Sequence, residues 1–189
     1  MRLPLFTLML SLVATTACNK PSQSSEAPST ANNIQKAAGS KPSGPKAQTA
    51  CELLTPVEIA GFLKVPAVKK DELNSGKNAM TKVDFCNWYV KENNPEGVQL
   101  ALRRAESDDE GSRTLVFSSA KGDAVEHDAE RDRKAEKLIG VGDEAIYAPY
   151  PDGKGGNVAM RVGASAVTIT GSASRDDLIS MAKLAGQRM

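Results

Sequence analysis

The sequence has few of the residues that build most metal and nucleophile sites. It contains one histidine, His127, and three cysteines among 189 residues, although imidazole and sulfur supply most metal ligands and nucleophile–base pairs. It also has no excess of one charge, because 24 Lys and Arg stand against 23 Asp and Glu. This balance argues against a nucleic-acid partner. Aromatic residues make up 4% of the chain, and the short length favours a single domain with few large core side chains.

The first 17 residues have the pattern of an export signal. Arg2 precedes an apolar run over residues 3–13, which is too short to span a bilayer. Thr-Thr-Ala at 15–17 then leads directly into Cys18, and this junction resembles the lipobox of bacterial lipoproteins. The resemblance implies cleavage before Cys18 and acyl chains on it, so that a membrane is a predicted partner. Ordinary signal-peptidase cleavage is the alternative, because Thr15 stands where the family usually has an aliphatic residue.

The residue after the lipidation site bears on the membrane that holds the chain. In lipoproteins of this kind, Asp at that place tends to retain the protein in the inner membrane of a Gram-negative cell. This chain has Asn19 instead. We therefore expect a protein anchored to the outer membrane and facing the periplasm.

Residues 19–50 have the composition of a disordered tether. Ile34 is their only large apolar side chain, so they cannot bury enough surface to offset the entropy of ordering. Their four lysines are spread rather than clustered, which favours a solubilising spacer over a site for anionic lipid. One globular domain is predicted over residues 51–189, which carry 19 basic and 22 acidic side chains.

Three helices are predicted from capping patterns and from the spacing of apolar residues. The first spans residues 55–64. The second spans 107–122 and is expected to turn residues 115–117, beginning with Leu115, toward the core. The third begins near Ser174. Residues 123–137 are mostly charged or small, which indicates a solvated helix or loop without a part in the core.

Five strands are predicted where β-prone residues run together or alternate. The first two, over 83–91 and 98–103, are joined by a turn at 93–97 and pair as a hairpin. Both faces of the first strand are expected to be covered, and the second is expected to be half-buried. Three further strands are expected over residues 145–148, 157–162 and 166–170.

The order of these elements is α, β, β, α, β, β, β, α. It indicates an α+β fold, in which helices pack on a mainly antiparallel sheet of about five strands. Once Cys18 is lipidated, Cys51 and Cys86 remain in an oxidising compartment, where an even pair is most simply a disulfide. A redox pair is the alternative, and it is disfavoured because the two cysteines lack Cys-x-x-Cys spacing.

Several short motifs of the domain resemble a known group of proteins. They are Cys-Glu-Leu-Leu-Thr at 51–55, Glu-Ile-Ala at 58–60, Cys-Asn-Trp at 86–88 and Gly-Val-Gly-Asp-Glu-Ala-Ile-Tyr at 140–147. In this order they resemble uncharacterised bacterial lipoproteins that share a domain of unknown function. The resemblance implies a disulfide-tied domain of the cell envelope, and it implies no activity.

The candidate catalytic residues each have a simpler interpretation. His127 lies in a charged stretch without a second histidine, which favours a surface position over a ligand or base. Asp143 and Glu144 precede a strand and point opposite ways if extended, which favours a role in the turn and strand entry. The glycine-rich residues 152–156 lack phosphate-loop spacing, and Ser165 lacks the second glycine of a nucleophile elbow. No catalytic residue, metal or cofactor is predicted.

The function expected from these observations is binding. Trp88, Tyr147 and Tyr150, with Asp143, form a candidate interaction surface. We expect a non-catalytic module that binds an envelope protein, as an inhibitor, an immunity factor or an assembly accessory. An envelope enzyme that acts through carboxylates, such as the acidic run 108–110 or the pair before the strand, is one alternative. A carrier of a small ligand or lipid is another, and it requires a cavity.

Overall fold

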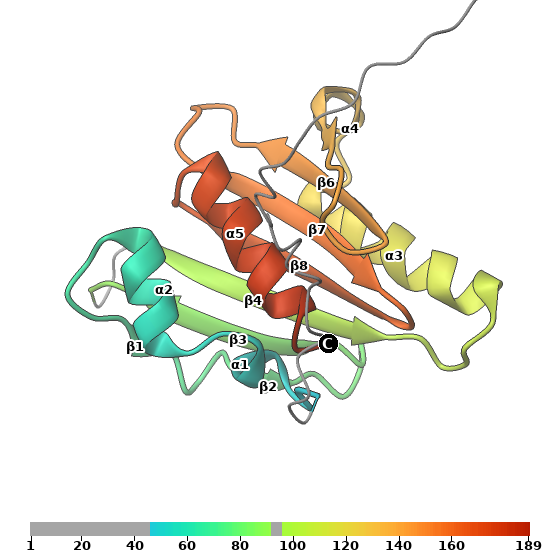
Figure 1. The fold of residues 1–189 in the computed structure, drawn as a ribbon, viewed down its shortest axis with the longest axis horizontal. Coiled ribbons are helices and arrows are strands. Elements are labelled where there is room, and N and C mark those ends of the chain that lie inside the picture. Colours follow the sequence, from blue (N-terminus) through green and yellow to red (C-terminus); the bar gives the residue numbers. More distant parts are fainter. Residues whose placement is uncertain (1–45, 92–95) are drawn as a thin grey trace, which may run out of the picture. The chain divides into compact units, whose positions relative to one another are not determined.

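The computed structural model describes residues 46–91 and 96–189. The predicted signal peptide, Cys18 and the tether up to residue 45 lie outside the described residues, as does most of the predicted turn at 93–97. The described part of the chain forms an antiparallel sheet with helices on both of its faces (Figure 1). The predicted α+β class and the antiparallel pairing are thus confirmed.

The sheet has eight strands rather than about five, and the described residues form five helices rather than three, so the predicted order α, β, β, α, β, β, β, α is wrong. The five long strands lie close to their predicted bounds, and β3 and β4 pair as the expected hairpin. The three additional strands have two residues each, so they carry no hydrophobic alternation that the sequence could reveal. Across the sheet the strands are β1 (Lys69–Lys70), β3 (Asp84–Tyr89), β4 (Gly97–Arg104), β8 (Ser165–Gly171), β7 (Gly156–Val162), β6 (Glu144–Pro149) and β5 (Glu136–Lys137), and β2 (Gly76–Lys77) also pairs with β3.

One face of the sheet carries a continuous apolar core, and we call it the disulfide face. The strand register aligns one row of buried side chains across it, from Cys86 on β3 through Leu100, Ile169 and Val158 to Tyr147 on β6. Three helices cover this row: α1 (Ala50–Leu53), α2 (Pro56–Leu63) and α5 (Arg175–Gly186).

The first of the predicted helices begins as its sequence indicates. The Thr55 hydroxyl accepts a hydrogen bond from the Glu58 backbone N–H, and the Glu58 carboxylate accepts one from the Thr55 N–H at 2.7 Å. This capping box satisfies two backbone donors at the start of α2. The helix ends at Leu63, and the capping residue Lys64 takes a left-handed backbone conformation with φ of 56°.

The predicted disulfide is confirmed and ties the disulfide face together. Cys51 on α1 is bonded to Cys86 on β3, with 5.1 Å between their Cα atoms. The folded part of the chain begins before this cysteine, because Ala47 and Ala50 are already buried. The described structure thus includes a few residues of the predicted tether.

The opposite face, which we call the groove face, carries a smaller core of small side chains. Helix α3 (Glu110–Ala124) packs on it, mainly over β7 and β8, and buries Ala120 and Ala124 against Ala159 and Ala166. The expectation that Leu115 turns inward is wrong, because this side chain is 71% exposed. The alanines let the helix approach the sheet closely, which leaves the larger residue outside.

Two further sequence expectations need correction on this side of the sheet. Residues 123–137 contain α4 (Ala129–Lys134) and β5, and they contribute the buried Val125 to the smaller core. They therefore do have a part in the core. Strand β3 is not covered on both faces, since Cys86 and Trp88 are buried whereas Phe85, Asn87 and Tyr89 on the groove face are half-buried.

Candidate binding groove

The predicted interaction residues do not form one surface. Trp88 is 3% exposed and Tyr147 is 8% exposed, and three strands separate β3 from β6. The Tyr147 hydroxyl donates to the Gly155 carbonyl at 3.0 Å, and burial raises the pKa of this phenol. Tyr150 is half-buried, with the Arg131 guanidinium 5.7 Å from its ring centre. These aromatic side chains serve packing where the structure places them.

The carboxylates before β6 are held by their neighbours. Asp143 accepts a hydrogen bond from the Gly163 backbone N–H at 2.7 Å, in the turn between β7 and β8. Its carboxylate also lies 3.7 Å from Arg161, to whose Nε Glu144 accepts at 3.3 Å. The strand-entry role is therefore what the structure shows, although the two adjacent carboxylates share one guanidinium, which the extended-chain expectation did not foresee.

The other candidate catalytic residues are likewise tied to local structure. Asp109 caps α3 by accepting from the Ser112 N–H at 2.9 Å, and hydrogen bonds from Ser107 and Ser112 hold its pKa well below the usual range. The side chain of His127 is 79% exposed and lies 3.8 Å from Asp123. Among residues 46–91 and 96–189, no group of three His, Cys, Asp or Glu side chains is placed to hold a metal ion.

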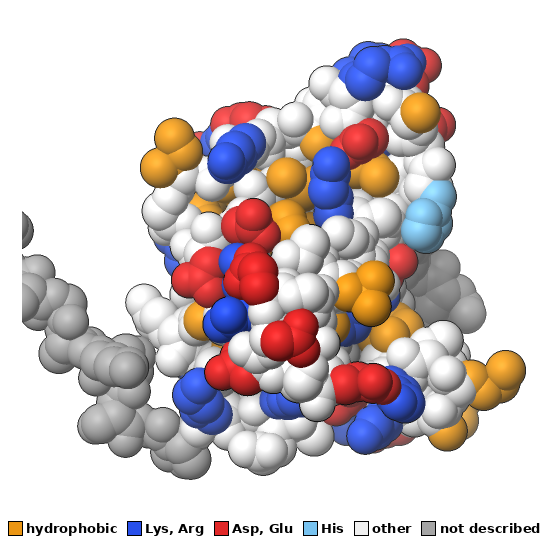
Figure 2. Space-filling view, turned by 90° about the vertical axis from the view of Figure 1, so that its right-hand side faces the viewer, with side chains coloured by type: hydrophobic (Ala, Val, Ile, Leu, Met, Phe, Trp, Pro, Cys, Tyr) orange, Lys and Arg blue, Asp and Glu red, His pale blue; other side chains and the backbone are white. Residues whose placement is uncertain are grey.

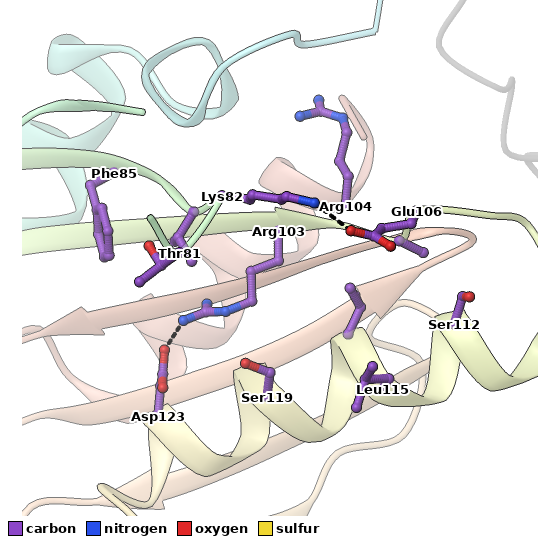
Figure 3. Close-up of a pocket in the computed structure, with 13 residues that line it drawn as sticks. Thr81, Lys82, Phe85, Arg103, Arg104, Glu106, Ser112, Leu115, Ser119 and Asp123 are labelled. Atoms are coloured by element: carbon purple, nitrogen blue, oxygen red, sulfur yellow. Dashed lines mark hydrogen bonds and ion pairs between the residues drawn. The ribbon is translucent and has the colours of Figure 1, made fainter. Parts of the chain in front are cut away.

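A groove on the groove face joins apolar and charged side chains. It has a volume of about 520 Å³. One wall is residues 81–85, which lead into β3, the floor is residues 103–106 at the end of β4, and the other wall is the side of α3 from Ser112 to Asp123 (Figure 3). It exists because α3 lies mainly over β7 and β8, which leaves the neighbouring part of β4 and β3 open.

Arg103 lies on the floor of this groove and is 8% exposed. Its Nη2 is bonded to the Asp123 carboxylate, and its Nη1 donates to the Ala101 carbonyl at 3.4 Å. Its Nε is buried without a hydrogen-bond partner. Burial disfavours the charged form and lowers the pKa of this guanidinium. A guanidinium has five N–H donors, and Arg103 uses two of them within the described residues.

The remaining charges of the groove are paired or turned away. Lys82 and Glu106 form an exposed pair at its mouth with 2.5 Å between Nζ and Oε1, and this bond raises the pKa of Lys82 and lowers that of Glu106. Arg104 points away from Arg103 (Figure 3) and donates to the Ala47 carbonyl at 2.8 Å. Each acidic side chain that lines the groove therefore has a cationic partner, and Arg104 adds one positive charge that is turned away from the floor.

The apolar part of the groove comes from α3, from β3 and from the residue that precedes β3. Val83 is buried, Phe85 and Val116 are half-buried, and Leu115 stands exposed on the rim. In the view of Figure 2, exposed hydrophobic side chains emerge between charged ones rather than as one continuous apolar face. The apolar surface that a partner meets on this side of the molecule is thus local, not extensive.

Sequence reasoning missed the groove because it placed Arg103 on the half-exposed side of its strand. The alternation Gln99, Ala101, Arg103 is typical of a solvent-facing row. No local pattern indicates the burial of Arg103, because its partner Asp123 lies twenty residues along the chain.

Comparison with protein-family models, curated proteins and solved structures found no match for this chain. Within residues 46–91 and 96–189, no helix is both long and apolar enough to cross a bilayer. Inferences about function therefore depend on the residues and geometry of the chain itself.

Proposed function

We propose that this protein is a lipoprotein, anchored through Cys18 to the outer membrane, whose periplasmic domain binds an envelope protein through the groove beside α3. The observation that carries the proposal is the position of Arg103 on the floor of this groove. A buried guanidinium with unused donors on the floor of an open, partly apolar groove provides both the polar and the apolar contacts of a binding site.

The hydrogen bonds and ion pairs that the acidic residues already make support a binding function over a catalytic one. A general acid or base needs a carboxyl group that is free to exchange a proton with a substrate. Asp109 is held by its capping bonds and Asp123 is bonded to Arg103, while Asp143 and Glu144 contact Arg161. Each of these carboxylates already has a structural partner.

The expected lipid anchor fits the position of the domain in the chain. Folded structure begins by Ala47, so fewer than 30 residues separate it from Cys18. If they form a flexible chain, the domain stands roughly 30 Å from the bilayer. Replacement of Cys18 by Ser is expected to release the protein from membrane fractions, and a Cys18→Ser protein that stays membrane-bound contradicts the anchor.

Site-specific photo-crosslinking in the native host tests the binding function. A photoreactive residue in place of Leu115, on the rim of the groove, is expected to capture one discrete protein partner. The matched control is the same residue in place of Ile139, which is equally large, 92% exposed and away from the groove. Absence of a crosslink at position 115, or the same products at both positions, contradicts the proposed function.

A further inference from the structure

Arg103 has unused hydrogen-bond donors, to which an oxygen atom of a ligand can bind. Each Nη atom of Arg103 carries a second N–H beyond the one bond it makes in the described residues, and a ligand oxygen that accepts from it gains a charge-assisted hydrogen bond. The guanidinium has no described partner at Nε and makes one bond from each of its Nη1 and Nη2 atoms. Its end lies between β4 and α3, facing the groove (Figure 3). A ligand oxygen seated on the floor would therefore accept from Nη1 or Nη2, because Nε is closed to solvent.

The pairing of charges at the floor and mouth of the groove indicates that the acceptor atom of the ligand is neutral. Asp123 already neutralises Arg103, and Glu106 neutralises Lys82 at the mouth. An added carboxylate or phosphate on the floor would lie beside Asp123, whose charge repels it, and the one unneutralised cation, Arg104, is turned away from the floor toward the Ala47 carbonyl. A carbonyl oxygen accepts the same hydrogen bonds without that repulsion.

The length and lining of the groove indicate an extended chain. The side of α3 that lines it, from Ser112 to Asp123, is about 16 Å long at the helical rise per residue. About five residues of extended peptide span that distance. Val83, Phe85 and Val116 provide an apolar site beside Arg103, which suits one large hydrophobic side chain.

We infer that the groove binds an extended, uncharged peptide segment of the partner protein, with a backbone carbonyl accepting from Arg103 and an apolar side chain between α3 and β3. This inference rests on the proposed protein-binding function and specifies the chemistry of the partner. The Ser119 hydroxyl on the wall of α3 offers a further hydrogen bond to the same segment.

Peptide selection on the full chain tests this inference. The protein carrying Cys18→Ser is used to select from a displayed library of random ten-residue peptides with flanks at both ends, so that no free terminus is offered. Selected sequences are then synthesised with acetyl and amide ends, and their dissociation constants are measured by fluorescence anisotropy. We expect the selected peptides to share a large apolar residue and to lack acidic residues.

Three variants locate the binding. Arg103→Met keeps an unbranched apolar stem but removes the guanidinium and its donors, and it is expected to weaken binding at least about tenfold, as loss of a hydrogen bond from a charged group does. Ser119→Trp fills the groove from an exposed position on α3 and is expected to weaken binding by a similar factor. Ser118→Trp is the control, because Ser118 is exposed on the same helix but does not line the groove, and its binding is expected to stay within twofold of the unchanged protein.

Several outcomes overturn the inference. Selection of acidic peptides, or a requirement for a free terminal carboxylate, assigns an anion site instead. Unchanged binding in both Arg103→Met and Ser119→Trp places the peptide elsewhere. Tight binding of palmitate with no peptide selected assigns a lipid carrier, and a dimer that Ser119→Trp dissociates assigns a second copy of this chain. If no peptide is selected while the crosslink at position 115 persists, the inference fails and the protein-binding function stands; if the crosslink is also absent, both fail.

Discussion

The two faces of the sheet are built from different materials. The disulfide face is closed by three helices over large aliphatic side chains and by the Cys51–Cys86 bond. The groove face is covered mainly by α3, over alanines, and leaves Phe85 half-buried at its open end. This difference indicates that the disulfide face supplies most of the stability of the fold, whereas the groove face remains available for contact with a partner.

Polar bonds replace part of the missing apolar contact on the groove face. The Thr168 hydroxyl donates to the Ala120 carbonyl at 3.0 Å, and the Asn157 side-chain amide donates to the Ala124 carbonyl at 2.6 Å. Both acceptors are in the second half of α3. Hydrogen bonds are directional and fix the position of a helix on the sheet. Apolar burial favours packing of the helix on the sheet but does not define its position. These two hydrogen bonds thereby hold the wall of the groove in position.

Removal of the disulfide is expected to have the largest effect on stability. Its two cysteines are 35 residues apart in sequence, and by the chain-entropy estimate a loop of that size contributes about 4 kcal/mol. The double variant Cys51→Ala, Cys86→Ala is therefore expected to lower the melting temperature by roughly 10 to 20 °C. Thermal unfolding followed by circular dichroism measures this, with Cys18→Ser as the cysteine control. A fall of only a few degrees would mean that the apolar core alone holds the disulfide face.

A pair of neighbouring residues tests the contrast between the faces directly. Leu100 is fully buried on the disulfide face, and Gln99 is exposed on the groove face of the same strand. Leu100→Ala is expected to cost about 3 kcal/mol, because it removes a buried side chain and leaves a cavity. Gln99→Ala is expected to stay within about 0.5 kcal/mol. Urea unfolding of both variants decides, and similar losses would show that the two faces share the stability evenly.

The regular elements of both faces were largely predictable from local patterns. The capping box of Thr55 and Glu58 fixed the start of α2, and the alternation of Val98, Leu100 and Leu102 placed β4 on the disulfide face. Such features depend on residues close together in sequence. The cysteine pairing was also accessible, because only two cysteines remained once Cys18 was assigned to lipid.

The groove was not predictable, because it depends on contacts between residues far apart in sequence. Its shape depends on where α3 crosses the sheet, and this is set by contacts of Ala120 and Ala124 with strands far away in sequence. Small residues have weak hydrophobic periodicity, so the pattern of the helix favoured Leu115 as the inward residue. The burial of Arg103 follows from its pairing with Asp123, twenty residues along the chain, which no local pattern reports.

Acid is expected to weaken the disulfide face through one ion pair. Arg188 binds the Glu58 carboxylate through both of its Nη atoms, at 2.9 and 2.6 Å, and this hydrogen bonding lowers the pKa of Glu58 to about 2. A group whose pKa is lower in the folded state stabilises the fold above its unfolded pKa of about 4.3 and loses this contribution as the pH falls toward 2. With allowance for solvent screening, the loss is about 1 to 2 kcal/mol.

The variant Glu58→Gln isolates this contribution. It removes the titration while it keeps an acceptor for the Thr55 N–H, so its stability is expected to change less between pH 5 and pH 2 than that of the unchanged protein. Urea midpoints measured across this range give the difference. Parallel pH profiles for the two proteins would show that other carboxylates govern the acid response.

The smallest expected effect concerns the polar attachment of α3. Thr168→Val keeps the shape of the side chain but removes the donor to the Ala120 carbonyl, and it is expected to cost about 1 kcal/mol. Because this bond holds only the groove face, hydrogen exchange is expected to rise in the second half of α3 and to stay unchanged in α5. Thr170→Val, the same substitution two residues along the same strand, serves as the control and is expected to leave both helices unchanged. If exchange rises equally in α3 and α5, the two faces unfold together, and the independence of the groove face from the disulfide face is lost.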